Sequence, residues 1–228
     1  MEQQIGTEGR MIEFKRPDGS ACQGYYAEAG QDRPGIVVIQ EWWGLNPQIR
    51  SVADRLAAVG FNALAPDLYH GRVAQDVDEA SHMMNGLDFP GATFQDIRGA
   101  VGHLLASGKG KVAVMGFCMG GALTVASAVH LPEVAAAVCY YGIPPRDFAD
   151  PAAIRIPFLG HFATRDTWCT PDVVAQLESA MLAAGQKPVL YRYEAEHAFF
   201  NKLRPTVYDP QAAELSWERT LTFLNQHL

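Results

Sequence analysis

The sequence lacks the features that mark several classes of protein. No apolar run approaches the roughly 20 residues needed to cross a bilayer, and Met1–Gln4 lacks the basic and apolar segments that open a signal peptide. Basic residues are in the minority: 18 Lys and Arg stand against 25 Asp and Glu, a net charge of −7, whereas nucleic-acid binders usually carry a basic face. We therefore expect a cytoplasmic protein that binds neither membrane nor nucleic acid.

Cysteine is also scarce. The four cysteines (Cys22, Cys118, Cys139 and Cys169) show no CxxC spacing, which argues against a zinc site or a redox dithiol. A chain that is not secreted and has a large core has no need of disulfides. We expect free thiols, and we expect neither a metal nor another cofactor.

The pattern that is present favours one large domain over residues 1–228. Hydrophobic residues make up 48% of the chain and charged residues 19%, which is ordinary for a compact soluble protein. Short apolar, β-branched runs alternate with stretches of helical spacing, and this alternation predicts an α/β fold. We expect a mostly parallel sheet of about eight strands with helices on both faces.

The expected elements can be placed by residue number. The predicted strands are Met11–Lys15, Ala21–Glu28, Gly35–Glu41, Phe61–Pro66, Lys111–Gly116, Val134–Tyr141, Ile156–Ala163 and Val189–Tyr193. The predicted helices are Gln48–Val59, Asp76–Met84, Thr93–Ser107 (with Thr93 or its neighbour as the cap), Met119–His130, Pro171–Ala184 and Pro210–Gln226. The pattern weakens between Asp67 and Gly91, and we interpret this segment as a loop-rich excursion near the functional site.

The segment Gly116–Gly121 (GFCMGG) lies between a predicted strand and a predicted helix. This arrangement is the strand–turn–helix elbow that presents a nucleophile in α/β-hydrolases, with cysteine in the place of serine. Glycines are needed because the turn is strained and tightly packed. The alternative is that Cys118 is a small buried hydrophobe, but its position at a helix start, which favours a thiolate, argues for a nucleophile.

A base and an orienting acid follow in the order that this fold requires. His197 comes after the last predicted strand, and Asp166 follows the predicted strand Ile156–Ala163. Asp166 could instead cap the turn before Pro171, and Asp172 is the nearest competing carboxylate, although it is better placed to begin a helix. His161 lies within a strand, and we expect it to be structural.

Glu41 is anomalous because it places a carboxylate at the end of a buried apolar strand, where an unpaired charge is costly. A nearby arginine could pair with it. Together with other segments, this neighbourhood resembles the dienelactone hydrolase family over nearly the whole chain from Gly35 onward. The matching segments are Gln40–Asn46 (QEWWGLN), Ala65–Tyr69 (APDLY), Gly116–Gly121, Tyr140–Gly142, Asp166 and Glu196–Phe199 (EHAF).

The resemblance implies an ester or lactone hydrolase with Cys118, His197 and Asp166 as its triad. In that family the glutamate at the place of Glu41 contacts the resting thiol and helps to activate it. The backbone N–H groups of Trp42 and Met119 would form the oxyanion hole. Cys118 would then form a thioester, and His197 would activate the water that cleaves it.

The substrate pocket departs from the family pattern. Family members hold a substrate carboxylate with arginines, one of them four residues after the histidine, where this chain has Asn201. Lys202 and Arg204 are close by, and Arg72 is the sole arginine of the excursion before Arg98. Aromatic side chains that could line a pocket, or equally pack in the core, are Trp42, Trp43, Tyr69, Tyr141, Phe199 and Phe200.

Two alternatives to a lactone hydrolase remain open from the sequence. The first keeps the triad and changes the substrate to activated aryl esters or phosphotriesters. The second is a ligand-binding protein on a hydrolase scaffold, which the complete triad disfavours. In either case the expected partner is a small molecule, and the chain is expected to be a monomer or a small homo-oligomer.

Overall fold

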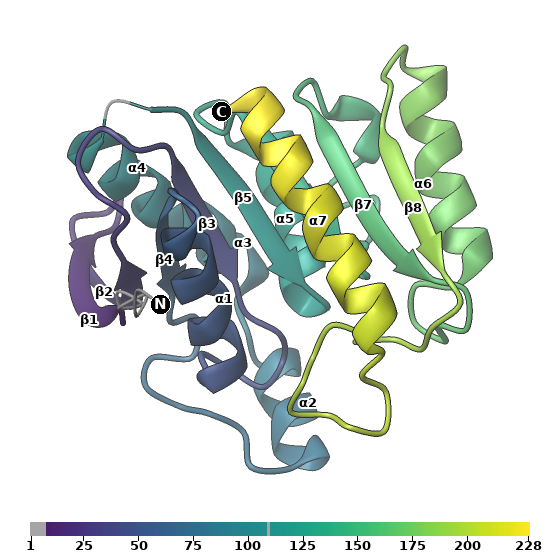
Figure 1. Cartoon of the computed structure of the whole chain (residues 1–228), viewed down its shortest axis with the longest axis horizontal. Helices are drawn as coiled ribbons and strands as arrows, with labels where there is room; N and C mark the ends of the chain where they lie inside the picture. Colours follow the sequence, from purple (N-terminus) through teal and green to yellow (C-terminus); the bar gives the residue numbers. More distant parts are fainter. Residues whose placement is uncertain (1–7, 109) are drawn as a thin grey trace, which may run out of the picture.

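A computed structural model describes residues 8–108 and 110–228, so Met1–Gln4, where no signal peptide is expected, lies outside the described residues. The chain forms one eight-stranded sheet in the order β1-β2-β4-β3-β5-β6-β7-β8 (Figure 1). The strands are β1 (Arg10–Lys15), β2 (Ala21–Ala27), β3 (Gly35–Ile39), β4 (Asn62–Pro66), β5 (Val112–Phe117), β6 (Ala136–Tyr140), β7 (Phe158–Ala163) and β8 (Val189–Tyr193). Only the β1–β2 and β2–β4 pairs of this sheet are antiparallel, which confirms the predicted mostly parallel sheet.

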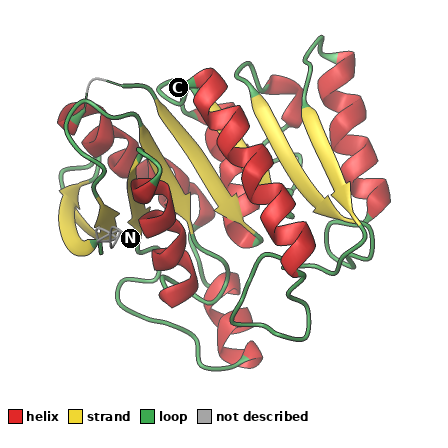
Figure 2. Ribbon diagram, in the orientation of Figure 1, coloured by secondary structure: helices red, strands yellow, loops and turns green. Residues whose placement is uncertain are grey.

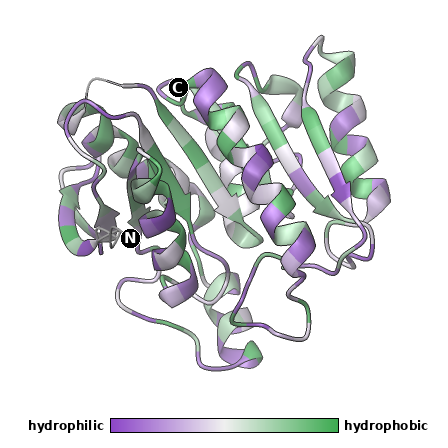
Figure 3. Cartoon of the chain, viewed as in Figure 1, coloured by the Kyte–Doolittle hydropathy of each residue, from purple (hydrophilic) through white to green (hydrophobic). Residues whose placement is uncertain are grey.

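Helices cover both faces of the sheet. The helices α1 (Pro47–Ala58) and α7 (Pro210–His227) pack on the face turned to the viewer in Figure 1, and α4 (Arg98–Ser107), α5 (Met119–His130) and α6 (Pro171–Ala183) pack on the other. Figure 2 shows the strands as one twisted layer between these helices. The central strands are the most apolar part of the chain (Figure 3), as expected of parallel strands that are buried on both faces.

Three helices begin with the same local device. The side chain of a polar residue accepts a hydrogen bond from a backbone N–H in the first turn, and a proline, whose missing N–H is no loss there, follows it. These pairs are Asn46–Pro47 for α1, Thr170–Pro171 for α6 and Asp209–Pro210 for α7. The predicted helices Pro171–Ala184 and Pro210–Gln226 begin at the same residues as α6 and α7.

The segment before α4 corrects one prediction. A helix was expected to begin near Thr93, but the helical backbone starts with α3 (Phe89–Gly91) and continues through the π-helical turn η1 (Ala92–Ile97) into α4. Asp88 caps this start by accepting from the N–H of Gly91 (3.0 Å). Thr93 lies inside this helical segment, where its hydroxyl donates a hydrogen bond to the carbonyl of Phe89 (2.9 Å). A cap residue would instead accept a hydrogen bond from a backbone N–H of the first turn.

The remaining elements are α2 (Val77–Asn85), in the excursion between β4 and β5, and the short 3-10 helix η2 (Pro151–Ala153) after β6. β3 ends at Ile39, so Glu41 lies two residues beyond the strand in which it was predicted. None of the helices described here is long and apolar enough to cross a membrane. Within residues 8–108 and 110–228, no group of three His, Cys, Asp or Glu side chains is arranged to hold a metal ion.

Candidate active site

Cys118 occupies a sharp turn between β5 and α5. Its backbone has φ 55° and ψ −118°, and a positive φ is strained for any residue with a side chain. The turn is held from both sides: the N–H of Cys118 donates to the carbonyl of Tyr140 (3.0 Å), and its own carbonyl accepts from the N–H of Ala122 (3.1 Å). The structure therefore has the elbow geometry that the glycine pattern predicted.

The glycines around Cys118 are required by close contacts of the backbone. A Cβ on Gly116 would lie 2.1 Å from the carbonyl oxygen of Gly120, and one on Gly142 would lie 2.0 Å from that of Cys118. Strain also concentrates here, because Tyr141 (φ 38°) and Ala198 (φ 64°) are further non-glycine residues with positive φ. Such clustering of strained backbone is typical of functional sites.

Asp166 and His197 are held together at this elbow. Nδ1 of His197 lies 2.7 Å from Oδ2 of Asp166, while Oδ1 of Asp166 accepts from the N–H groups of Trp168 (2.7 Å) and Cys169 (2.9 Å). Burial raises the pKa of Asp166, but the hydrogen bond and charge of His197 and the two amides outweigh it, so the pKa lies below its usual value. Asp166 is therefore a fixed anion that orients the imidazole.

The imidazole of His197 lies beside Cys118. Burial lowers the pKa of His197, but the bond to Asp166 and then the neighbouring Cys118 sulfur raise it to about 10. Among the described residues Nε2 has no hydrogen bond of standard geometry although it is buried, and both His197 and Cys118 line the same small cavity. This nitrogen is thus available for proton exchange with the thiol and with a substrate.

Glu41 lines the same cavity, and its hydrogen bonds are made with Asn201 and Tyr141. It is 2% exposed, it accepts from the amide Nδ2 of Asn201, and the hydroxyl of Tyr141 donates to it at 3.4 Å. Burial raises the pKa of Glu41, and the charge of His197 and the Asn201 hydrogen bond oppose that rise. Asn201, in the place of the family arginine, is itself buried (1% exposed) and binds Glu41 rather than lining a cavity.

The two amides expected to form an oxyanion hole come from adjacent strands. β3 and β5 pair through Ile39 and Gly116, so the residues that follow each strand are neighbours. Met119 is the first residue of α5, where an N–H has no acceptor within the helix. Met119 lines one cavity that reaches Cys118 and Trp42 lines another, so both residues lie near the sulfur.

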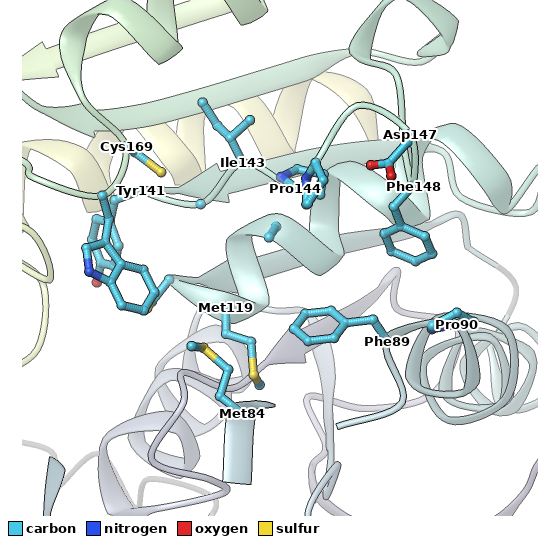
Figure 4. Close-up of a pocket in the computed structure, with 15 residues that line it drawn as sticks. Met84, Phe89, Pro90, Met119, Tyr141, Ile143, Pro144, Asp147, Phe148 and Cys169 are labelled. Carbon is cyan, nitrogen blue, oxygen red and sulfur yellow. The ribbon is translucent and has the colours of Figure 1, made fainter. Parts of the chain in front are cut away.

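Two cavities meet at Cys118. The larger one (about 530 Å³, Figure 4) is lined mainly by apolar side chains, with Asp147 as its charged residue. Its walls are Met84, Phe89, Pro90, Cys118, Met119, Ala122, Tyr141, Gly142, Ile143, Pro144, Pro145, Asp147, Phe148, Trp168 and Cys169. The smaller one (about 230 Å³) is more polar and is lined by Glu41, Trp42, Trp43, Val77, Cys118, Thr167, Trp168, His197, Ala198 and Arg204.

The residues proposed from the sequence to bind substrate divide into two groups. Tyr141 lines the large cavity, and Trp43 and Arg204 line the small one. The guanidinium carbon of Arg204 lies 5.6 Å from the centre of the Trp43 ring. These three side chains are therefore placed to contact a molecule bound at Cys118.

The other group is not among the residues that line either cavity. The hydroxyl of Tyr69 donates to the sulfur of Met119 (3.3 Å), and the exposed Arg72 pairs with Glu79 (3.4 Å) in a separate hollow. Phe199 is fully buried and packs in the core. Each of these side chains makes a hydrogen bond, an ion pair or core contacts of its own. Asn201 likewise donates a hydrogen bond to Glu41.

Trp168 was not identified from the sequence. Its side chain is large, 52% exposed, and lines both cavities. Its ring centre lies 5.5 Å from that of Trp42 and 5.7 Å from that of His197. The available signal was its position two residues after Asp166, which places it beside any base that Asp166 orients.

His161 is structural, as its place in a strand suggested. It is fully buried, with Nδ1 2.8 Å from the Tyr193 hydroxyl and Nε2 3.0 Å from the Thr220 hydroxyl. Burial, and then the charge of Arg219, lower the pKa of His161 to about 3. The residue is therefore neutral and ties β7 to β8 and α7.

Comparison with known proteins shows the family of this chain. The model of the dienelactone hydrolase family matches residues 22–228. The chain is 33% identical to the protein usf of Aquifex pyrophilus (96% of this chain, 99% of the relative). It is 31% identical to a protein of Aquifex aeolicus provisionally named carboxymethylenebutenolidase (96% and 99%).

A solved structure extends the agreement to three dimensions. The crystal structure of a provisionally named dienelactone hydrolase from Klebsiella pneumoniae superposes with a TM-score of 0.86 at 26% identity, covering 96% of this chain and 99% of the other. The resemblance seen in the sequence motifs is thus confirmed over the fold as well. The chain belongs to the dienelactone hydrolase family and is an α/β-hydrolase of the ester- and lactone-hydrolysing class.

Proposed function

We propose that this chain hydrolyses esters and lactones with Cys118 as the nucleophile, through a thioester intermediate. The observation that carries the proposal is the elbow of Cys118 beside a histidine whose other nitrogen lies 2.7 Å from Asp166. This is the nucleophile–base–orienter arrangement of acyl transfer.

The proposed reaction has an acylation step and a deacylation step, and His197 transfers a proton in each. The Cys118 thiolate attacks the carbonyl carbon and forms a C–S bond, while the N–H groups of Trp42 and Met119 stabilise the oxyanion. The intermediate collapses as the ester C–O bond breaks, and the departing alkoxide takes a proton from Nε2 of His197, which holds the proton that the Cys118 thiol gave up. Water then attacks the thioester while His197 accepts its proton, and the C–S bond breaks to release the acid and the thiolate.

The wall of the large cavity favours neutral substrates. The large cavity is mainly apolar, and the position of the family arginine is taken by Asn201, which is occupied by Glu41. An anionic dienelactone would therefore gain little from this wall and would lose its hydration. We expect neutral activated esters to be hydrolysed at least as efficiently as anionic dienelactones.

The nucleophile can be tested by substitution and by alkylation. Cys118→Ala should abolish ester hydrolysis while its thermal unfolding stays close to that of wild type, because the deleted sulfur borders two cavities and its loss leaves no closed void in the core. Alkylation with iodoacetamide, followed by mass spectrometry, should remove activity in proportion to modification at Cys118. Cys22→Ala, in β2 away from both cavities, is the matched control. Activity that survives complete modification of Cys118 would refute the proposal.

A second candidate activity is the hydrolysis of activated phosphotriesters. It is supported by fold neighbours described as a dienelactone hydrolase-like promiscuous phosphotriesterase (TM-score 0.82, 24% identity) and as an esterase phosphorylated by paraoxon (TM-score 0.70, 20% identity). An open apolar cavity beside a thiolate suits such substrates. Turnover of paraoxon that disappears in Cys118→Ala would support it, and absence of both turnover and covalent phosphorylation would exclude it.

We also propose that the protein works in the cytoplasm. All four cysteines are free in the structure, and a reducing compartment protects a catalytic thiolate from oxidation. Localisation of the tagged full chain by fractionation would test this.

A further inference from the structure

The two cavities at Cys118 differ in size and chemistry, and only one of them borders the base. His197 and Arg204 line the small cavity and are not among the residues of the large one. Met119 lines the large cavity and Trp42 the small one. A carbonyl held by the amides of these two residues would therefore sit at the boundary between the cavities.

The proton path fixes which part of an ester enters which cavity. The departing alkoxide must accept its proton from Nε2 of His197, so the oxygen that leaves has to point to the side on which His197 lies. The acyl group is attached to the opposite side of the carbonyl carbon. The leaving group is thereby directed into the small cavity, and the acyl group is directed into the large one.

We infer that the large cavity is the acyl site and the small cavity is the alcohol site, so that the preferred substrates are neutral esters of bulky apolar acids with small alcohols. This inference rests on the proposed function and adds its substrate class. The volumes agree with it, since about 530 Å³ is in the range of ligand pockets, about 300–1,000 Å³, and about 230 Å³ is below that range.

The chemistry of the walls points in the same direction. The large cavity presents Met84, Phe89 and Phe148; in Figure 4, Met84 and Phe89 lie in the lower part of the view and Phe148 lies to the upper right of them. Such walls bind an alkyl chain or an aryl ring favourably, because binding removes apolar surface from water. In the small cavity, Glu41 and Arg204 surround the leaving group with polar groups, which suit a short or hydroxylated alcohol.

Trp168 separates the two sites. It lines both cavities, and its indole packs edge-on against Trp42 (74° between planes) near the His197 ring. The geometry gives this side chain the role of a specificity-determining residue that keeps acyl and alcohol groups on their own sides. Trp168→Ala should join the cavities and weaken the discrimination between them.

The assignment can be tested with variants that fill one cavity at a time. Ala122→Leu narrows the large cavity, and Val77→Phe, at a position that is 52% exposed, narrows the small one. The acyl series is p-nitrophenyl acetate and hexanoate; the alcohol series is phenyl acetate and 2-naphthyl acetate. Using the variant-to-wild-type ratio of kcat/KM for each substrate cancels the intrinsic reactivity of the esters.

Ala122→Leu should lower the hexanoate-to-acetate ratio by about 10-fold or more, the discrimination that one or two methylene groups in an apolar pocket supply. Val77→Phe should lower the naphthyl-to-phenyl ratio by a similar factor. Leu182→Phe, at an exposed position of α6, should change neither ratio and controls for added aromatic surface. If Ala122→Leu does not fold, Ile143→Ala should instead raise the hexanoate-to-acetate ratio.

The opposite pattern would overturn the assignment: Ala122→Leu impairing naphthyl acetate and Val77→Phe impairing hexanoate. Equal effects of both variants on both series would overturn it as well. These outcomes are distinct from failure of the proposed function, in which no ester would be hydrolysed in a Cys118-dependent manner by the wild-type chain.

Discussion

Glu41→Gln separates a structural role of this carboxylate from a catalytic one. The amide has the same shape as the carboxyl group, and it can keep both contacts: its oxygen accepts from Asn201, and its NH2 group donates to the hydroxyl of Tyr141. The substitution also removes a charge whose burial is unfavourable, as the raised pKa of Glu41 shows. We therefore expect the free energy of unfolding to change by no more than about 1 kcal/mol, roughly the net worth of one hydrogen bond.

The chemical effect should be larger. A raised pKa makes the Glu41 carboxylate a stronger proton acceptor, and positioned bases contribute about 10²–10⁴-fold to a rate. Because His197 remains as a second base, we expect the acylation step to slow by about 10-fold or more. Deacylation, which depends on His197 and Asp166, should stay close to the wild-type rate.

Stopped-flow kinetics with a p-nitrophenyl ester distinguishes the two steps, since the burst reports acylation and the steady state reports deacylation. Glu196→Gln is the matched control, because Glu196 is adjacent to His197 in sequence but is half-exposed and pairs with Arg165 (2.7 Å). An unaltered burst in folded Glu41→Gln would refute a catalytic role for Glu41 and leave His197 as the sole base.

Three further outcomes are expected. Gly142→Ala should destabilise the fold by several kcal/mol in urea titrations (about 3 or more), because the new methyl carbon would start 2.0 Å from the carbonyl oxygen of Cys118; a wild-type midpoint would contradict the tight elbow. Asn201→Ala should cost about 1–3 kcal/mol, since it leaves one oxygen of buried Glu41 without its donor, and unchanged stability would contradict this. His161 has a pKa of about 3 in the folded protein against 6.5 in the unfolded chain, so its contribution to stability is complete above pH 6.5 and is lost as pH falls toward 3. The free energy of unfolding should fall by about 2 kcal/mol between pH 6.5 and 5. This fall should be absent in His161→Gln.

The fold, and the meeting of Asp166 and His197 beside Cys118, could be predicted from the sequence because each element and motif has a local signal. Strands buried on both faces are continuous apolar runs, and the elbow requires glycines at fixed distances from Cys118. The start of the helix before α4 was misplaced because Thr93 satisfies its hydroxyl within the helix, so the cap residue Asp88 was not recognised. Propensity favours both residues as caps, and only packing decides between them.

The cavity walls were less predictable because they depend on long-range packing. Tyr69, Phe199 and Tyr141 are similar aromatic residues near family motifs, but only Tyr141 faces a cavity at Cys118. Tyr141 also has a positive φ (38°), a backbone conformation that no local pattern in the sequence predicts. The partner of Glu41 was likewise unexpected, because an amide contributed from a loop 160 residues away replaces the anticipated arginine.

The four residues of the turn from Asp166 to Cys169 both hold the Asp166 carboxylate in place and form part of the cavity walls. The backbone amides of Trp168 and Cys169 hold the acid that orients the base, while their side chains form part of the cavity walls. Laboratory evolution toward new substrates will therefore meet a trade-off at this turn. Exchanges of Trp168 that reshape the turn should slow every substrate, whereas exchanges on the facing wall, such as Phe89 or Phe148, leave the acid untouched and offer the freer route to altered selectivity.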